Sequence, residues 1–143
     1  MRFLVLVLVI PLVCTFGQST QQNSVAEPQT RLHGMLQVGE FFGPPGYGED
    51  PAVDRLEHSY YLQMSVPLNE QPGFVSLPQE ADNDAGSTYF VQLVIYANDQ
   101  AEAKTFVGKE VTLVGTLMTA ISGHHRTPVL LVVKSIHAFK KWK

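Results

Sequence analysis

Two adjacent histidines, His124 and His125, are the side chains that most directly suggest chemistry. They lie in the segment Ser-Gly-His-His-Arg-Thr-Pro, residues 122–128. Imidazole is the commonest metal-binding side chain, and in a turn the two rings could converge, with Glu49 or Asp50 completing a metal site. Adjacent histidines lack the spacing of established zinc motifs. The alternative is that one histidine hydrogen-bonds to the loop backbone while the other is solvated.

A second unusual loop precedes this one in the chain. Residues 43–51 read Gly-Pro-Pro-Gly-Tyr-Gly-Glu-Asp-Pro, and these glycines and prolines fix a turn-rich path. If the fold brings the two loops together, acidic side chains of residues 43–57 face the histidines and the arginine of the other loop. The predicted binding residues are Tyr47, Glu49, Asp50, Gly123, His124, His125, Arg126 and Thr127.

The sequence does not reveal a catalytic set. Nucleophilic catalysis needs a nucleophile, a base within reach and an orienting group. Ser122 stands near His124 in the sequence, but no nucleophile-elbow motif surrounds it. No catalytic residue is therefore predicted, and an envelope hydrolase is kept only as an alternative.

The elements that would position these loops are mostly strands. Alternating apolar residues and β-branched or aromatic runs predict five of them. Between the third and fourth, Asp99 and Glu102 stand in capping-box spacing and Gly108 is a natural stop, which predicts a short helix. The five predicted strands cover residues 31–42, 58–66, 89–96, 111–120 and 129–139.

The order β-β-β-α-β-β predicts an all-β fold with one short helix. It matches the OB-fold, a five-stranded Greek-key barrel with its helix between strands three and four. The loops of residues 43–57 and 120–128 would then flank the usual ligand face of that fold. An α+β sandwich of the same elements is the alternative.

The N-terminal segment predicts export. Arg2 is followed by an apolar run over residues 3–13 and then by small residues, as in a secretory signal peptide. The run is too short for a membrane-spanning helix, so residues 1–17 are expected to be removed after Gly17. The lone Cys14 would leave with them, and the mature chain would hold neither a thiol nor a transmembrane segment. Residues 18–30 are expected to form a disordered leader, and residues 31–143 the OB-like domain, in the periplasm or secreted.

Charge argues against nucleic acid as the partner. The chain has 10 basic and 13 acidic side chains, giving a formal net charge of −3, and its strands show no clear interleaving of basic and aromatic residues. An envelope protein, peptide or glycan fits an exported domain better. No cofactor is predicted apart from the metal hypothesis, and the oligomeric state is left open.

Both loops also resemble one family. The stretch GTLMTAISGHHRTPVLL, residues 115–131, and the earlier FGPPGYG, residues 42–48, are similar to small exported bacterial domains of unknown function. Those domains share a Gly-His-His-x-Thr-Pro loop motif. The likeness covers most of residues 32–137. Many members carry a third histidine where this chain has Arg126, and arginine is not an ordinary metal ligand. The resemblance implies an exported OB-like domain, and we expect a binding module that uses the two loops.

Overall fold

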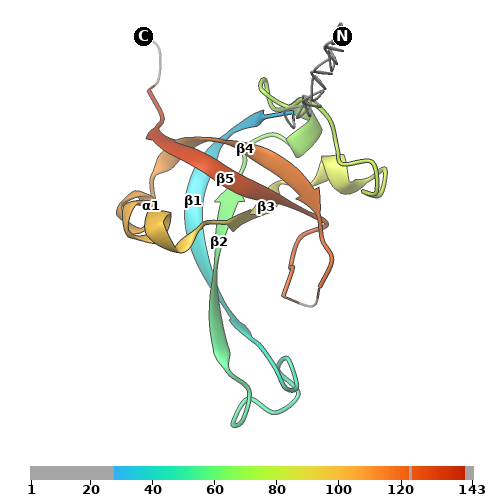
Figure 1. Cartoon of the computed structure of the whole chain (residues 1–143), viewed down its shortest axis with the longest axis vertical. Coiled ribbons are helices and arrows are strands. Elements are labelled where there is room, and N and C mark those ends of the chain that lie inside the picture. Colours follow the sequence, from blue (N-terminus) through green and yellow to red (C-terminus); the bar gives the residue numbers. More distant parts are fainter. Residues whose placement is uncertain (1–27, 123, 141–143) are drawn as a thin grey trace, which may run out of the picture.

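Five strands close into a barrel in the computed structural model, which describes residues 28–122 and 124–140. Around the barrel they follow the order β1-β2-β3-β5-β4, and β4 returns to pair with β1 (Figure 1). β3 and β5 are parallel, while the other neighbours are antiparallel. The predicted OB-like barrel is confirmed, and the α+β sandwich is not what forms. The strands are β1 (Thr30–Phe42), β2 (Leu56–Gln63), β3 (Phe90–Val94), β4 (Glu110–Thr119) and β5 (Val129–Ala138).

The predicted helix lies between β3 and β4. It comprises a 3-10 turn, η3 (Ala97–Asp99), followed by α1 (Gln100–Phe106). The capping role predicted for Asp99 is wrong, since its backbone is already helical and its side chain makes no capping hydrogen bond. The reason is that η3 leads directly into α1, with the N–H of Asp99 donating to the carbonyl of Tyr96 at 2.9 Å. Gly108 ends the segment with φ of +76°, as its position predicted.

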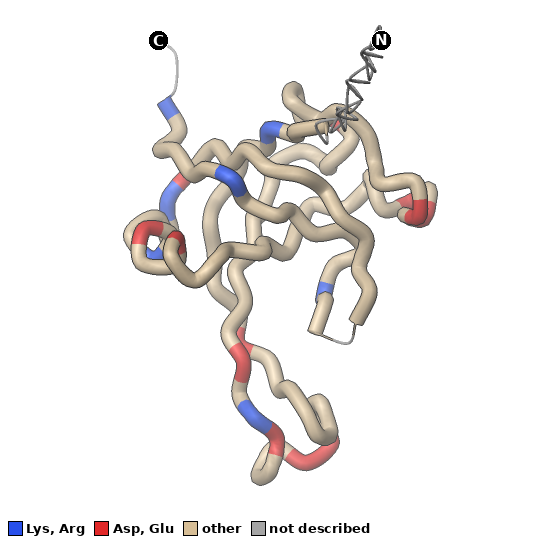
Figure 2. The backbone as a smooth tube through the Cα atoms, viewed as in Figure 1, with Lys and Arg blue, Asp and Glu red and all other residues tan. Residues whose placement is uncertain are grey.

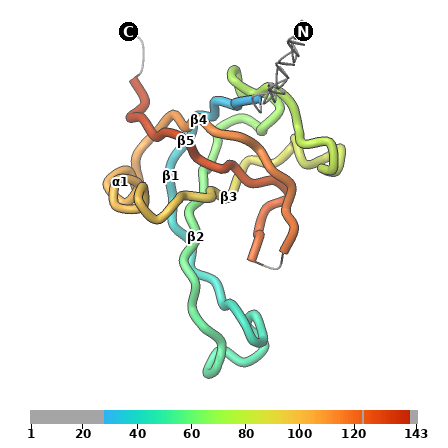
Figure 3. The backbone as a smooth tube through the Cα atoms, in the orientation of Figure 1, coloured from blue at the N-terminus to red at the C-terminus, as the bar shows by residue number. Residues whose placement is uncertain are grey.

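The core follows the alternation of β1 only in the first half of that strand. Leu32 and Leu36 are fully buried, whereas Val38 and Phe42 are 41% and 37% exposed although they have the same parity. Pairing with β4 ends at Met35, while pairing with β2 continues to Phe42. The end of β1 therefore leaves the barrel as half of a projecting two-stranded hairpin (Figure 3).

One glycine in β4 allows the barrel to close tightly. A Cβ atom on Gly115 would lie 2.1 Å from the carbonyl oxygen of Val132. The pairing of β4 with β5 shifts register between Val114 and Gly115, as at a β-bulge, where glycine is common. Gly115 therefore marks an irregularity in β4 at which the two strands come very close.

The long connection between β2 and β3 packs against the barrel. It contains two 3-10 turns, η1 (Leu68–Glu70) and η2 (Ala85–Ser87). Leu68 and Ala85 are buried in the core, and the buried Gln71 accepts a hydrogen bond from the backbone N–H of His33 at 3.0 Å. Within the described residues, no helix combines the length and the apolar character needed to cross a bilayer.

Several sequence predictions fall outside the described residues. These are the signal peptide of residues 1–17 with its cleavage at Gly17, the leader up to residue 27, Gly123, and the last three residues, 141–143. The first strand begins at Thr30, one residue before the predicted start of the domain.

Candidate functional site

The two loops singled out by their composition lie against each other. Nδ1 of His124 is 2.9 Å from a carboxylate oxygen of Glu57. Nη2 of Arg126 donates to the carbonyl of Phe42, also at 2.9 Å. Both contacts join the β4–β5 loop to the projecting β1–β2 hairpin, so the sequence prediction that these loops are neighbours is correct.

Charge is divided between the two loops. Acidic residues run along the hairpin and its tip, whereas the β4–β5 loop carries the positive charge of Arg126 (Figure 2). Arg55 is the basic residue within the hairpin loop. The acidic residues of the hairpin are Glu40, Glu49, Asp50, Asp54 and Glu57.

Asp54 organises the turn at the tip of the hairpin. Its side chain is buried and accepts backbone N–H groups from Gly46 at 2.6 Å, Gly48 at 2.7 Å and Asp50 at 3.3 Å. Burial acts to raise the pKa of Asp54, but the three hydrogen bonds outweigh it and hold the pKa below its usual 3.8. The carboxylate therefore fixes the path of residues 46–50.

That path presents Tyr47 to the other loop. Tyr47 has φ of +53°, a left-handed conformation that is uncommon for a bulky residue. Its ring meets the ring of His124 edge-on, with centroids 5.8 Å apart, and the guanidinium of Arg126 lies 5.9 Å from the Tyr47 centroid. Strained backbone of this kind clusters at functional sites and persists because its surroundings hold it.

Gln92 of β3 holds the β4–β5 loop in place. Its buried side chain accepts the backbone N–H of Arg126 at 2.6 Å and donates to the carbonyl of His124 at 3.1 Å. Its own N–H donates at 3.0 Å to the hydroxyl of Thr127, which in turn donates to the carbonyl of Val129 at 2.6 Å. The backbone at His124 and Arg126 is thus anchored to the barrel.

His125 hydrogen-bonds to the backbone of its own loop, which is one of the two alternatives that the sequence left open. Its Nδ1 accepts the backbone N–H of Ile121 at 2.8 Å, and its own N–H donates to the carbonyl of Ser122 at 3.0 Å. These two bonds close the turn. Nδ1 of His125 is therefore engaged by backbone.

The carboxylate that meets His124 is Glu57 rather than Glu49 or Asp50. Among the residues that the structure describes, no three His, Cys, Asp or Glu side chains come together as a metal site. The metal and hydrolase hypotheses stay predictions, and Glu57 is the carboxylate that the structure places beside His124.

A groove of about 480 Å³ lies between the hairpin and the β4–β5 loop. Arg126 stands over the ring of Phe41 with 5.3 Å to the centroid, and the ring of Phe41 packs against that of Tyr61 at 5.5 Å. A Cβ on Gly39 would lie 2.6 Å from the Phe41 ring, so glycine gives this ring its room. The groove is lined by Gln37, Val38, Gly39, Phe41, Tyr61, Thr88, Phe90, Arg126, Thr127 and Pro128.

Tyr61 is the unusual polar group in this groove. The residue is 8% exposed, and its hydroxyl is buried without a hydrogen-bond partner among the described residues. Burial raises the pKa of the phenol, against the lowering effects of the neighbouring Ser59 hydroxyl and of the charge of Arg126. The hydroxyl therefore stays protonated at neutral pH.

Sequence reasoning missed Phe41, Tyr61 and Gln92 as site residues. A signal for two of them was present, since Phe41 and Tyr61 are aromatic residues on the parity of their strands that does not face the core. Gln92 gave no such signal, because a glutamine inside a strand reads as an ordinary exposed residue.

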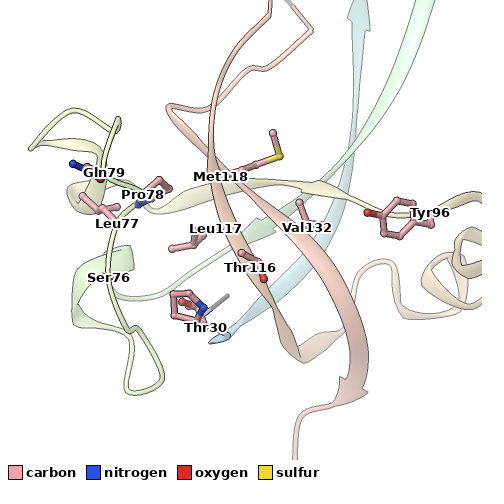
Figure 4. A pocket seen from close by; sticks show the side chains of 11 residues that line it. Thr30, Ser76, Leu77, Pro78, Gln79, Tyr96, Thr116, Leu117, Met118 and Val132 are labelled. Atoms are coloured by element: carbon pink, nitrogen blue, oxygen red, sulfur yellow. The ribbon is translucent and has the colours of Figure 1, made fainter. Parts of the chain in front are cut away.

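A larger hollow, of about 600 Å³, lies elsewhere on the barrel (Figure 4). Leu77 and Pro78 of the β2–β3 connection and Leu117 and Met118 of β4 line it. Its described lining includes no Asp, Glu, His, Lys or Arg. The groove beside Arg126 therefore has the stronger case as a functional site.

Comparison with known families finds a match for the C-terminal strands of the barrel. A family described as Domain of unknown function (DUF4431) matches residues 90–137, which run from β3 to β5 and include Gln92 and Arg126. The hairpin of β1 and β2 lies outside the match. Comparison with curated proteins and with solved structures finds no match. The matched part of the chain is thus similar to a domain of unknown function.

Proposed function

We propose that this chain is an exported binding module that grips an envelope protein, peptide or glycan in the groove between the β1–β2 hairpin and the β4–β5 loop. The observation that carries the proposal is the buried Tyr61 hydroxyl, which makes no hydrogen bond of normal geometry with the described residues and belongs to a residue lining the groove beside Arg126. Buried polar groups are nearly always hydrogen-bonded, and an exception in a cleft indicates a missing partner.

The neighbouring contacts support binding. Gln92 fixes the backbone of the β4–β5 loop, and that loop lines the groove with Arg126 and Thr127, so this wall of the groove is held by hydrogen bonds before any ligand arrives. Preorganised walls reduce the entropy that binding must overcome. Export itself rests on the signal-peptide pattern of residues 1–17, and a mature protein whose N-terminus follows Gly17 is the expected product.

Two matched variants test the binding face. Val38 lines the groove and is 41% exposed, whereas Val75 is 56% exposed on the β2–β3 connection and is not among the groove residues. A glutamate at position 38 places a charge in the groove, and the same change at position 75 does not. We expect wild-type protein and Val75→Glu to co-purify a common partner from envelope extract, and Val38→Glu to lose it.

The folded state of both variants is checked by circular dichroism and thermal melting. The proposal is contradicted if Val38→Glu melts like the wild type and still retains the partner. It is equally contradicted if the wild-type protein recovers nothing beyond the Val38→Glu background.

A further inference from the structure

We infer that the groove takes an organic carboxylate with an apolar body, bound between the Tyr61 hydroxyl and the Arg126 guanidinium. The inference rests on the proposed function and names the chemistry of its ligand. Hydroxyl and guanidinium groups are both hydrogen-bond donors at neutral pH. Two donors of this kind, one of them charged, complement an oxygen anion.

Most N–H groups of the Arg126 guanidinium make no hydrogen bond with the described residues. Nη2 donates to the carbonyl of Phe42, and no other hydrogen bond of the guanidinium is seen in the described part of the chain. The guanidinium has five N–H groups. The guanidinium carbon lies 5.3 Å from the centroid of the Phe41 ring and 5.9 Å from that of Tyr47, and contacts of this kind with a ring face use none of the N–H donors.

The position of the Tyr61 hydroxyl favours a charged ligand over a neutral one. That hydroxyl is shielded from water, while the neighbouring Arg126 is exposed. The charge of Arg126 is near enough to lower the pKa of Tyr61. A ligand oxygen at the hydroxyl therefore lies in the field of the guanidinium, which favours an anion over a neutral group.

The charges around the groove favour a ligand that carries a single negative charge. Glu57 and Asp54 lie on the same hairpin as the groove and Arg126 is the only charged residue among its lining residues. One cation balances one carboxylate. A doubly charged phosphate would keep excess negative charge next to an acidic hairpin, which is unfavourable.

The rest of the groove accommodates the apolar body. Val38 and Phe90 are exposed apolar side chains on its lining, and Phe41 and Pro128 add further carbon surface. Such a ligand could be a free small acid or the C-terminal residue of a peptide. Both present the same carboxylate next to an apolar group, and the test separates them.

Isothermal titration of the full chain with matched probes decides the question. The probes are 3-phenylpropionate and its amide, and N-acetyl-Ala-Ala-Phe as the free acid and as the C-terminal amide. We expect at least one acid to bind and its amide to bind at least about tenfold more weakly, because a charge-assisted hydrogen bond is lost. Binding of the small acid as tightly as the peptide identifies a small organic acid, and binding of the peptide alone identifies a peptide C-terminus.

Three variants assign the effect to residues. Arg126→Gln and Tyr61→Phe should each weaken acid binding by about tenfold or more, and Lys134→Gln, an exposed change on β5, should leave it unchanged. The inference is overturned if no acid binds at 10 mM (roughly the millimolar limit of weak binding), if acid and amide bind alike, or if Arg126→Gln binds like wild type. If acid and amide bind equally well and Val38→Glu abolishes the binding of both, the preference for a carboxylate is wrong. The proposed function, binding in the groove, would still hold.

Discussion

Asp54 shows how one side chain can set the shape of a loop from which other residues act. Three backbone N–H groups converge on its carboxylate, and the resulting turn holds Tyr47 in a left-handed conformation. The conformation of Tyr47 at the hairpin tip therefore depends on Asp54. Gly46 lets the backbone approach this carboxylate closely, since a Cβ there would lie 3.1 Å from Oδ1, and Gly48 adopts φ of +103°.

The lowered pKa of Asp54 predicts acid sensitivity of the hairpin tip. Because the folded pKa lies below the usual 3.8, the ionised carboxylate stabilises the fold fully above that usual value. The stabilisation is lost as the pH falls through the lower, folded pKa. In an acid titration followed by NMR, the amide signals of Gly46 and Gly48 should shift or broaden below about pH 4.

Asp54→Asn provides the control for that titration. We expect the variant to melt several degrees lower at neutral pH and to lose the acid transition at Gly46 and Gly48. Glu49→Gln, which removes a nearby exposed charge, should keep both. An acid transition that persists in Asp54→Asn would assign it to another group.

Tyr61→Phe separates the stability of the barrel from its function. The hydroxyl has no partner among the described residues, and an unsatisfied buried polar group costs about 1–3 kcal/mol. Thermal or urea unfolding should therefore show the variant to be as stable as the wild type, or more stable by about 1 kcal/mol, even though it binds acids more weakly. A fall in stability of several degrees would mean that the hydroxyl already has a structural partner.

At the scale of elements, the length of β1 relative to the barrel creates the groove. An isolated two-stranded hairpin is marginal in water, and this one projects beyond the last β1–β4 pair, at Met35. The β4–β5 loop supports it through the contacts of Arg126 and His124. Arg126 thus both supports the hairpin and lines the groove.

The features that could be predicted from the sequence are those set by local sequence patterns. Alternation identified the strands of the closed barrel, and loop composition identified the two loops that meet. Val38 and Phe42 broke the pattern because no sequence rule says where a strand leaves its sheet. His124 contacts Glu57 rather than Glu49, and this choice depends on a turn whose path is set by Asp54. The spacing of residues in the sequence does not encode such a tertiary contact.

Gly115→Ala tests the tightest closure of the barrel. A methyl group there would lie 2.1 Å from the carbonyl oxygen of Val132, so two strands must separate, at a cost of about 2–3 kcal/mol. Gly108→Ala is the matched control, because φ is +76° there but nothing lies within 4 Å of the added atom. That change should cost only about 1–2 kcal/mol from its left-handed backbone. Urea unfolding that ranks Gly108→Ala as the more damaging change would contradict this account.

At the scale of the whole molecule, the barrel is complete without the residues that precede it. β1 starts at Thr30, pairs with both β2 and β4, and buries Leu32 and Leu36. Hydrogen bonds around a closed sheet leave no long edge to protect. The single cysteine, Cys14, precedes the described residues, so no disulfide contributes to the barrel.

A chain that starts at Pro28 should therefore fold by itself in a reducing cytosol. Its far-ultraviolet circular dichroism should be that of a β-rich protein, and its melting temperature should equal that of a chain that starts at Gln18 within about 2 °C, a difference well under 1 kcal/mol. Dithiothreitol should not change that temperature, because a barrel held by buried side chains and strand pairing contains nothing to reduce. An aggregated product, or a melting temperature that differs by more than about 2 °C from that of the longer chain, would show that residues 18–27 take part in folding.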